Sequence, residues 1–241
     1  MKEIYVIGEI GQNHNGSVII AKEIIDRAAK PVRDPLFNRE LKSMDAVKLT
    51  KRDLKEELSA SAMAKPYSSK HSFGHTYGEH REALELNDEE HFEIYKYTKA
   101  KGLDFVETLC GVGCTSMFRL FEPDRLKVAS RDLTNLPLLN VLAETKIPII
   151  LSTGMGGPKE LDDALEVLTK HHNDISILHC LSQYPSDYEN INLLTIPYLK
   201  KRYSDYTIGY SDHSIGIVIP VAAVTLGAEI IEKHITLDRD M

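Results

Sequence analysis

The amino-acid sequence predicts a closed (β/α)8 barrel, a TIM barrel, in which the eighth helix is missing or incomplete. Short runs rich in β-branched residues recur eight times, and segments with helical periodicity lie between them. Most of the runs are continuously apolar rather than alternating, which is typical of parallel strands covered on both faces. The length of 241 residues also suits this fold, for which about 250 residues is typical.

The predicted strands are separated by enough residues for a helix between most neighbours. Their ranges are 4–9, 45–50, 103–108, 126–130, 147–152, 175–180, 206–211 and 229–234. Strands that alternate with helices pair in parallel, because each helix returns the chain to the starting edge of the sheet. An open doubly wound sheet is the alternative, but no Gly-x-Gly-x-x-Gly phosphate loop follows the first run.

Two of the predicted helices have clear boundary signals. One begins after Asn87, which has a capping-box spacing with Glu90, and ends at Gly102. The other has Pro158 in its first turn, where proline is tolerated. Its core-facing side is marked by Leu161, Leu165 and Leu168.

The end of the chain and two long connections depart from a regular barrel. Residues 215–228 are apolar nearly all round, so we predict a buried helix there despite Pro220. Only residues 235–241 follow the last strand, too few for an eighth helix, and we expect one barrel domain over 1–241. Residues 31–44 and 51–87 are long and polar, and loops of that length are usually functional or mobile.

Composition excludes several classes of protein. Lys and Arg total 29 against 36 Asp and Glu, a formal net charge of -7, so we expect no nucleic-acid partner. The N-terminus lacks the features of a signal peptide and no run reaches membrane-spanning length, so we expect a cytoplasmic protein with no membrane partner. Cys110, Cys114 and Cys180 are too few and too unevenly spaced for a disulfide framework, which suits a reducing compartment.

The residues that close the predicted strands are the site candidates, because active sites of parallel barrels lie at the C-terminal strand ends. Many are polar, and Lys or Glu is costly to bury there without a ligand or an opposite charge. Lysine charges and hydroxyl donors suit a small, highly charged phosphate or carboxylate. The candidates for this anion cradle are Lys48, Thr108, Lys127, Ser130, Ser152 and Ser211.

His213 and His234 close the seventh and eighth strands in matching positions. Adjacent strands would make them converge, and paired imidazoles beside Glu or Asp suit a divalent transition metal. A single strand-end histidine is more often a hydrogen-bonded structural residue, but the matched pair favours a metal site. For Lys48 the alternative is a solvated amine at the end of its strand.

Several motifs extend along nearly the whole chain. They include IGEIGQNHNGS, KPYSSKHSFGHTYGEHREALEL, LKVASRDLTNLPLL, ILSTGMG, LHCLSQYPSDYENINL and GYSDHSIGI, followed by AAVTLGAEIIEKHITLDRDM. Together they resemble the catalytic barrel of the sialic acid synthase (N-acetylneuraminate synthase) family. These enzymes condense phosphoenolpyruvate with N-acetylmannosamine or its 6-phosphate. The SKHSFGHTYGEH segment is particularly similar to the branch that includes the animal 9-phosphate synthases.

The resemblance implies a role for each matching position. Phosphoenolpyruvate would be held by Lys48, Thr108, Lys127, Ser130, Ser152 and Ser211, and a divalent metal, Mn2+ or Mg2+, by His213 and His234. Glu9, Asp132 and Tyr184 would face the amino sugar, and Glu232 would lie close to the reacting centre. The expected catalytic groups are Glu9, Lys48, Lys127 and Glu232. The resemblance also implies a homodimer.

The sequence departs from the family in several places. The family usually has Gln at the position of Thr50 and Gly at the position of Arg131, and residues 31–44 are longer than its usual link. An acidic sugar contact just beyond Met241 is absent from this sequence. Also absent is the C-terminal antifreeze-like domain, which lends an arginine to the partner subunit's site.

We therefore expect a metal-dependent condensation that gives N-acetylneuraminate, or its 9-phosphate, and inorganic phosphate. Glu232 or Glu9 would transfer protons, and sequence does not separate their roles. One alternative is a sister synthase that makes legionaminic, pseudaminic or a deaminated nonulosonic acid. Another is a barrel that keeps the metal and anion site without catalysis.

Overall fold

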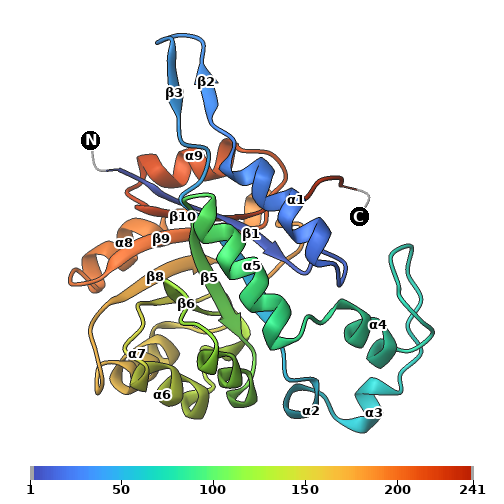
Figure 1. Cartoon of the computed structure of the whole chain (residues 1–241). Coiled ribbons are helices and arrows are strands. Elements are labelled where there is room, and N and C mark those ends of the chain that lie inside the picture. Colours follow the sequence, from blue (N-terminus) through green and yellow to red (C-terminus); the bar gives the residue numbers. More distant parts are fainter. Residues whose placement is uncertain (1–2, 240–241) are drawn as a thin grey trace.

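A computed structural model, which describes residues 3–239, contains eight parallel strands closed into a barrel (Figure 1). The strands are β1 (Tyr5–Gly11), β4 (Ala46–Lys51), β5 (Asp104–Leu109), β6 (Arg125–Val128), β7 (Ile149–Ser152), β8 (Ile175–Cys180), β9 (Thr207–Asp212) and β10 (Ile230–His234). Each pairs with its neighbour along the chain, and β1 pairs with both β10 and β4, which closes the ring. The predicted fold class and its eight strands are confirmed.

Helices surround the barrel, but not with one regular helix after every strand. The α-helices are α1 (Val18–Ala29), α2 (Leu54–Glu57), α3 (Ala60–Met63), α4 (Tyr77–Leu84), α5 (Asp88–Ala100), α6 (Leu136–Glu144), α7 (Pro158–Leu168), α8 (Thr195–Arg202) and α9 (Val218–Thr225). Three 3-10 helices are η1 (Val112–Arg119), η2 (Ser130–Asp132) and η3 (Tyr188–Asn190), and η1 alone connects β5 to β6. Over residues 3–239 no helix follows β10, and none has the length and apolar character needed to cross a membrane.

The predicted boundary signals form as expected. The Asn87 side chain accepts a hydrogen bond from the Glu90 amide at 2.9 Å, and Glu90 Oε2 accepts one from the Asn87 amide at 2.8 Å. These reciprocal bonds satisfy two amides that the start of α5 would otherwise leave unpaired. After α5 the chain reverses at Gly102, whose φ of 75° is readily adopted only by a residue without a Cβ. In α7 the three leucines are buried, as predicted.

The prediction that the last helix is buried is wrong. In α9 only Pro220 and Ala223 are buried, whereas Val218 and Val221 are 74% and 61% exposed. The helix packs against β9 on one side, and apolar residues around the rest of its circumference face solvent. Apolar residues on every side of this helix therefore did not predict that every side is buried.

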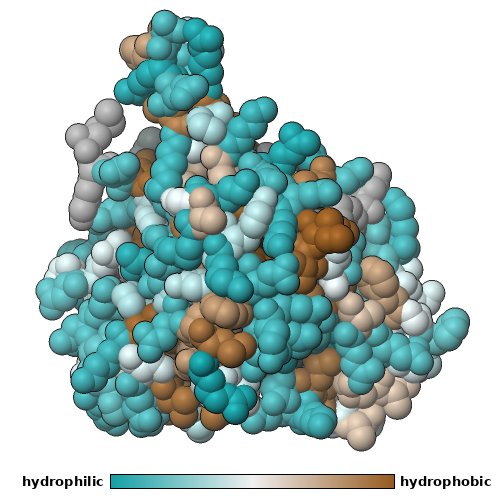
Figure 2. Space-filling model, viewed as in Figure 1, coloured by the Kyte–Doolittle hydropathy of each residue, from teal (hydrophilic) through white to brown (hydrophobic). Residues whose placement is uncertain are grey.

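Both long connections contain regular structure. Residues 31–44 form an antiparallel ribbon of β2 (Val32–Asp34) and β3 (Arg39–Leu41), which projects from the barrel (Figure 1). At its tip the hydrophobic residues Leu36 and Phe37 are 80% and 66% exposed. The rest of the face shown in Figure 2 is mainly hydrophilic. The second connection folds into α2, α3 and α4, which lie together beside the barrel (Figure 1).

Candidate active site

The interior of the barrel changes from apolar to polar toward its C-terminal end. An apolar layer inside the barrel consists of Ile7, Ala46, Val106, Ile150, Leu178 and Ile230. Because side chains alternate along a strand, the residue two positions later points into the same interior, one layer nearer the mouth. Those residues are Glu9, Lys48, Thr108, Ser152, Cys180 and Glu232. Strand geometry alone therefore gathers charged and hydroxyl groups above an apolar floor.

These side chains line a cavity of about 510 Å³ at the barrel mouth. The structure brings the following predicted residues to it: Glu9, Lys48, Thr108, Lys127, Ser130, Ser152, Tyr184, Ser211, His213, Glu232 and His234. Cavities of this size are typical of small-molecule sites. The prediction of one shared site is thus supported in its geometry, while the role of each residue stays a prediction.

Asp132 is the predicted site residue that does not line this cavity. It lies on η2 and lines a neighbouring cavity of about 410 Å³, together with Glu57 and Arg131. Its Oδ2 accepts a hydrogen bond from Arg131 Nε at 3.2 Å, and its Oδ1 accepts one from Asn135. Ser130 and Arg131 of the same 3-10 turn line the larger cavity, so Asp132 lies next to it but does not line it.

Lys48 is buried at the base of the cavity between two carboxylates. Its Nζ donates to Glu9 Oε1 at 2.6 Å and to Thr108 Oγ1 at 3.2 Å, and lies 3.7 Å from Glu232 Oε2. This arrangement excludes the alternative of a solvated amine. A buried ammonium is costly unless it is paired, so the two glutamates stabilise Lys48 in its charged form.

Lys127 and Ser211 meet the other oxygen of Glu232. Lys127 Nζ lies 3.5 Å from Glu232 Oε1, and Ser211 Oγ donates to the same oxygen at 2.8 Å. Glu232 Oε2 and Ser152 Oγ are buried without a hydrogen-bond partner among the described residues. Buried polar atoms without partners are uncommon, so these two mark positions where a ligand atom would be favoured.

The charges at the base of the cavity depend on one another. Burial raises the pKa of Glu9, but the charges of Lys48, His234 and Lys127 outweigh it and lower the pKa to about 2. Burial lowers the pKa of Lys48, yet the charges of Glu232 and Glu9 raise it overall. Both groups are therefore ionised at neutral pH. The two lysine charges offset the two glutamate charges, so the base carries little net charge.

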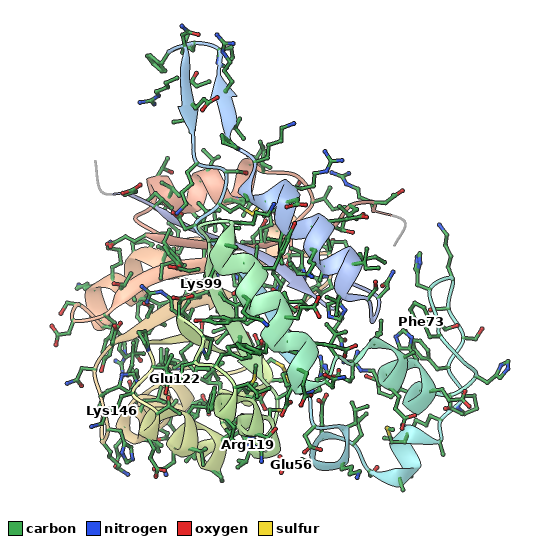
Figure 3. The ribbon with its side chains drawn as sticks, viewed as in Figure 1. Glu56, Phe73, Lys99, Arg119, Glu122 and Lys146 are labelled. Atoms are coloured by element: carbon green, nitrogen blue, oxygen red, sulfur yellow. The ribbon has the colours of Figure 1, made fainter. Side chains whose placement is uncertain are left out.

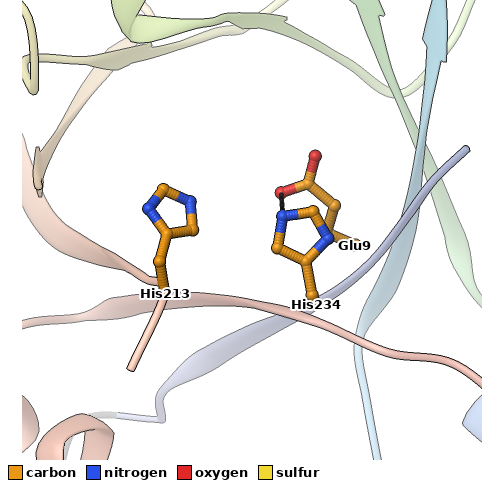
Figure 4. Close-up of side chains that lie close together, drawn as sticks. All are labelled: Glu9, His213 and His234. Atoms are coloured by element: carbon orange, nitrogen blue, oxygen red, sulfur yellow. Dashed lines mark ion pairs between the residues drawn. The ribbon is translucent and has the colours of Figure 1, made fainter. Parts of the chain in front are cut away.

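Glu9, His213 and His234 come together on one side of the mouth (Figure 4). One potential ligand atom from each lies within 4.8 Å of the others, and His234 Nε2 is 3.4 Å from Glu9 Oε2. His213 Nδ1 is 2.8 Å from the Leu181 carbonyl oxygen. That contact requires Nδ1 to donate, which leaves Nε2 with its lone pair for a metal. Two imidazoles and a carboxylate fit a divalent cation.

Tyr184 covers the same side of the mouth. Its ring centroid is 3.9 Å from that of His213 and 6.0 Å from that of His234, and the residue is 66% exposed. The ring thus packs against the histidine pair on one face and meets solvent on the other. A ligand that enters from solvent would pass this ring before it reached the buried lysines.

Sequence reasoning missed several residues that line the cavity. Cys180 was recognisable by alternation, because it stands two positions after the interior residue Leu178. Arg52 and Arg131 lie beyond the ends of their strands, where alternation no longer applies. The other missed residues include Gln12, Asn13, Met155 and Ser182.

Comparisons with known proteins agree with this architecture. The sequence model of the NeuB family matches residues 40–241. The N-acetylneuraminate-9-phosphate synthase of Drosophila melanogaster is 34% identical over 98% of this chain and 61% of its own length. The N,N'-diacetyllegionaminic acid synthase of Campylobacter jejuni is also 34% identical, over 100% of this chain and 70% of its own length. The chain spans about three fifths of the length of the 9-phosphate synthases that it matches.

Solved structures extend the likeness to the fold. The N-acetylneuraminic acid synthetase of Leptospira borgpetersenii, in complex with citrate, has a TM-score of 0.81 at 32% identity and covers 99% of this chain and 75% of its own. A DAHP synthase of Thermotoga maritima, with a TM-score of 0.66 at 15% identity over 97% of this chain and 60% of its own, shares the fold alone. Since the family model matches most of the sequence and synthases above 30% identity match nearly all of it, this chain belongs to the NeuB family.

Proposed function

We propose that the barrel catalyses condensation of phosphoenolpyruvate with N-acetylmannosamine or its 6-phosphate. The products are N-acetylneuraminate or its 9-phosphate, and inorganic phosphate. The observation that carries the proposal is a single cavity that holds a carboxylate and two imidazoles close together, above two buried lysines. We propose that the barrel itself is the catalytic domain. The homodimer stays a prediction, which light scattering would test.

Lys48 and Lys127 would bind the charged groups of phosphoenolpyruvate, with directed hydrogen bonds from the hydroxyls around them. Ser152 Oγ supports this role because it is buried and has no partner among the described residues. Thr108 and Ser211 already hold Lys48 and Glu232 in place through hydrogen bonds. Groups fixed in advance lower the entropic cost of bringing the enol carbon to the acceptor.

Glu9, His213 and His234 would hold the divalent metal, Mn2+ or Mg2+. A bound divalent ion supplies Lewis acidity, which polarises the acceptor aldehyde and orients a water molecule. Glu9 is then a poor proton acceptor, because its lowered pKa makes the carboxylate a weak base and both of its oxygens already have partners. We therefore assign proton transfer to Glu232, whose Oε2 is free of hydrogen bonds within the described chain.

The reaction balances without an oxidant or reductant. The enol carbon C3 forms a bond to the aldehyde carbon, whose oxygen takes a proton and becomes a hydroxyl. Water adds to C2, and the tetrahedral intermediate then expels inorganic phosphate and leaves a keto acid. Lys48 and Lys127 would stabilise the phosphate as it leaves, because both amines are held at the base of the cavity by the glutamates.

A sister synthase is the second candidate, because relatives with other products are equally similar. The legionaminic acid synthase is 34% identical to this chain, as is the 9-phosphate synthase. Both reactions would use the same buried lysines, and only the part of the cavity that faces the sugar would differ. We propose the cytoplasm as the site of the reaction, because all three cysteines are free thiols.

The test is release of inorganic phosphate from phosphoenolpyruvate with Mn2+ and a range of amino-sugar acceptors, with mass spectrometry of the product. We expect phosphate release that depends on N-acetylmannosamine or its 6-phosphate and that stops on addition of EDTA. Turnover only with a different acceptor would favour the sister synthase. Absence of phosphate release with every acceptor, even with a family C-terminal domain supplied, would favour a barrel without catalysis.

A further inference from the structure

Two of the residues that line the cavity are arginines to which no role has been assigned so far. Arg52 follows β4 and Arg131 lies on η2 after β6, and both line the 510 Å³ cavity. Arg81 of α4 is only 9% exposed, and its charge interacts with those of Arg52 and Glu57. None of these arginines has a part in the proposed chemistry. Two guanidinium groups at the mouth, with the charge of a third acting on one of them, therefore need an explanation.

A single carboxylate, Glu57 of α2, holds two of these groups together. Glu57 Oε1 accepts a hydrogen bond from Arg131 Nη1 at 2.5 Å and another from Arg52 Nη1. Burial raises the pKa of Glu57, but the hydrogen bond from Arg131 and the charges of Arg52, Arg131 and Arg81 outweigh it and lower the pKa. Glu57 is thus ionised at neutral pH and fixes Arg52 and Arg131 side by side.

The two rim arginines keep donors that nothing in residues 3–239 accepts. Arg52 Nε is buried and has no partner there. Arg131 donates a hydrogen bond from Nη1 to Glu57 and another from Nε to Asp132. Its Nη2 donates none within the described chain. Buried donors without partners carry a desolvation cost, which an anion at the rim would relieve. Arg81 has two more buried donors without partners and adds positive charge behind the pair.

Arg131 lies across the mouth from His234, and Glu57 holds Arg52 beside it, although Arg52 follows β4, which pairs with the strand of Glu9. In the closed barrel, β6 and β10 are four strands apart in either direction around the ring, so Arg131 and His234 stand on opposite sides. An acceptor with its aldehyde next to His213 and His234 would extend its other end over the cavity. That end would approach the rim formed by Arg52 and Arg131.

We propose that Arg52 and Arg131 bind an anionic group on the acceptor sugar, at the end distant from its aldehyde. A guanidinium fork binds phosphate monoesters and carboxylates in the same bidentate way, so the shared chemistry is a terminal oxyanion. This inference rests on the proposed function and deepens it, since it names the acceptor class.

The test is calorimetric titration of the full chain with three sugars in the presence of Mn2+. They are N-acetylmannosamine, its 6-phosphate and its 6-carboxylate analogue, N-acetylmannosaminuronate, and the last two distinguish the sources of the oxyanion. We expect one anionic sugar to bind at least about 10-fold more tightly than the neutral sugar. Arg131→Gly should abolish that preference, and Arg131→Lys, which keeps the charge but not the fork, should reduce it.

Arg119→Gly is the matched control, because Arg119 is an exposed arginine of η1 that does not line the cavity (Figure 3). It should keep the preference for the anionic sugar. Circular dichroism would show whether Arg131→Gly folds, and Arg131→Lys carries the test if it does not. Equal affinity of the folded wild type for all three sugars would overturn the inference, as would a selective loss of phosphoenolpyruvate affinity in Arg131→Lys.

The inference and the proposed function fail in different ways. Phosphate release with the neutral sugar, without any preference for an anionic one, would overturn the role of the arginines and keep the condensation. An anion preference that depends on Arg131, without phosphate release from any acceptor, would keep that role and overturn the condensation.

Discussion

At the scale of single residues, Glu9 contacts two different neighbours through its two carboxylate oxygens. Its Oε1 pairs with Lys48 at 2.6 Å, and its Oε2 faces His234 at 3.4 Å. The sequence placed Glu9 at a strand end but could not predict which partner each of its oxygens contacts. Those contacts depend on side-chain rotamers and on residues distant in sequence. For the same reason the sequence did not separate the roles of Glu9 and Glu232, and the roles proposed above rest on their contacts.

His213→Ala should abolish specific Mn2+ binding and leave the fold intact. The imidazole contributes one of three potential ligands at the barrel mouth and makes little contribution to the core. We expect Mn2+ affinity, measured by calorimetry, to fall at least about 100-fold. His71→Ala, a change of an exposed histidine remote from the cavity, is the control. Unchanged Mn2+ affinity in His213→Ala would refute the ligand assignment.

His14 should make the fold sensitive to mild acid. Burial and the nearby charge of His91 lower its pKa from 6.5 to about 4. Above pH 6.5 the imidazole is neutral in both the folded and the unfolded state. As the pH falls below 6.5, the imidazole of the unfolded chain becomes protonated while that of the folded chain stays neutral. The free energy of unfolding therefore falls as the pH approaches 4. Between pH 7 and pH 5 this amounts to about 2 kcal/mol.

Urea unfolding at both pH values measures the effect. The loss of unfolding free energy should be smaller in His14→Gln, whose side chain does not titrate. Wild type and variant with the same loss between the two pH values would show that His14 does not cause the sensitivity.

At the scale of elements, the helices and strands with a repeating hydrophobic pattern or a local boundary signal were predictable, whereas elements without either signal were not. The eight barrel strands have buried, β-branched runs, and α5 and α7 have boundary residues that act locally. The β2–β3 ribbon was missed because each of its strands has only three residues and is largely exposed, which is too short for a hydrophobic alternation to mark it. The exposure of α9 was missed because burial depends on what packs around a helix, which its own sequence does not state.

The β2–β3 ribbon should be dispensable for stability. Its strands pair only with each other in the described part of the chain, and its tip is exposed. Replacement of residues 32–41 by a short Gly-Ser link should change the unfolding free energy by no more than about 0.5 kcal/mol. Asn87→Ala, which removes the capping box of α5, should cost about 1 kcal/mol and serves as the positive control. Thermal unfolding of the two variants tests this, and a larger loss from the ribbon deletion would contradict it.

At the scale of the whole molecule, closure of the barrel decides which charges meet. Lys48 and Glu232 come from β4 and β10, and their charged groups lie 3.7 Å apart only because β1 pairs with both strands. Closure was predictable from the number of strands, so the cavity and half of its lining residues followed from the sequence. The Arg52–Glu57–Arg131 cluster did not, because it joins residues beyond strand ends through long side chains.

Metal and phosphoenolpyruvate should each increase the affinity of the chain for the other. The two lysines at the base are offset by Glu9 and Glu232, so an anion gains little until a cation compensates Glu9. We expect removal of metal with EDTA to weaken phosphoenolpyruvate binding at least about 5-fold. Thermal shifts with each ligand alone and with both measure the coupling, since a ligand that binds the native state raises its stability. Strictly additive shifts would contradict it.

The ribbon of residues 31–44 also has a practical consequence. It precedes β4, so it leaves the barrel at the N-terminal ends of the strands, whereas the cavity opens at the other end. A fluorescent dye, an affinity tag or a covalent tether at the exposed tip would therefore lie at the end of the barrel opposite the cavity. Molecules immobilised through Phe37 or its neighbours would present their open mouths to the solution, which suits surface-based assays and flow reactors.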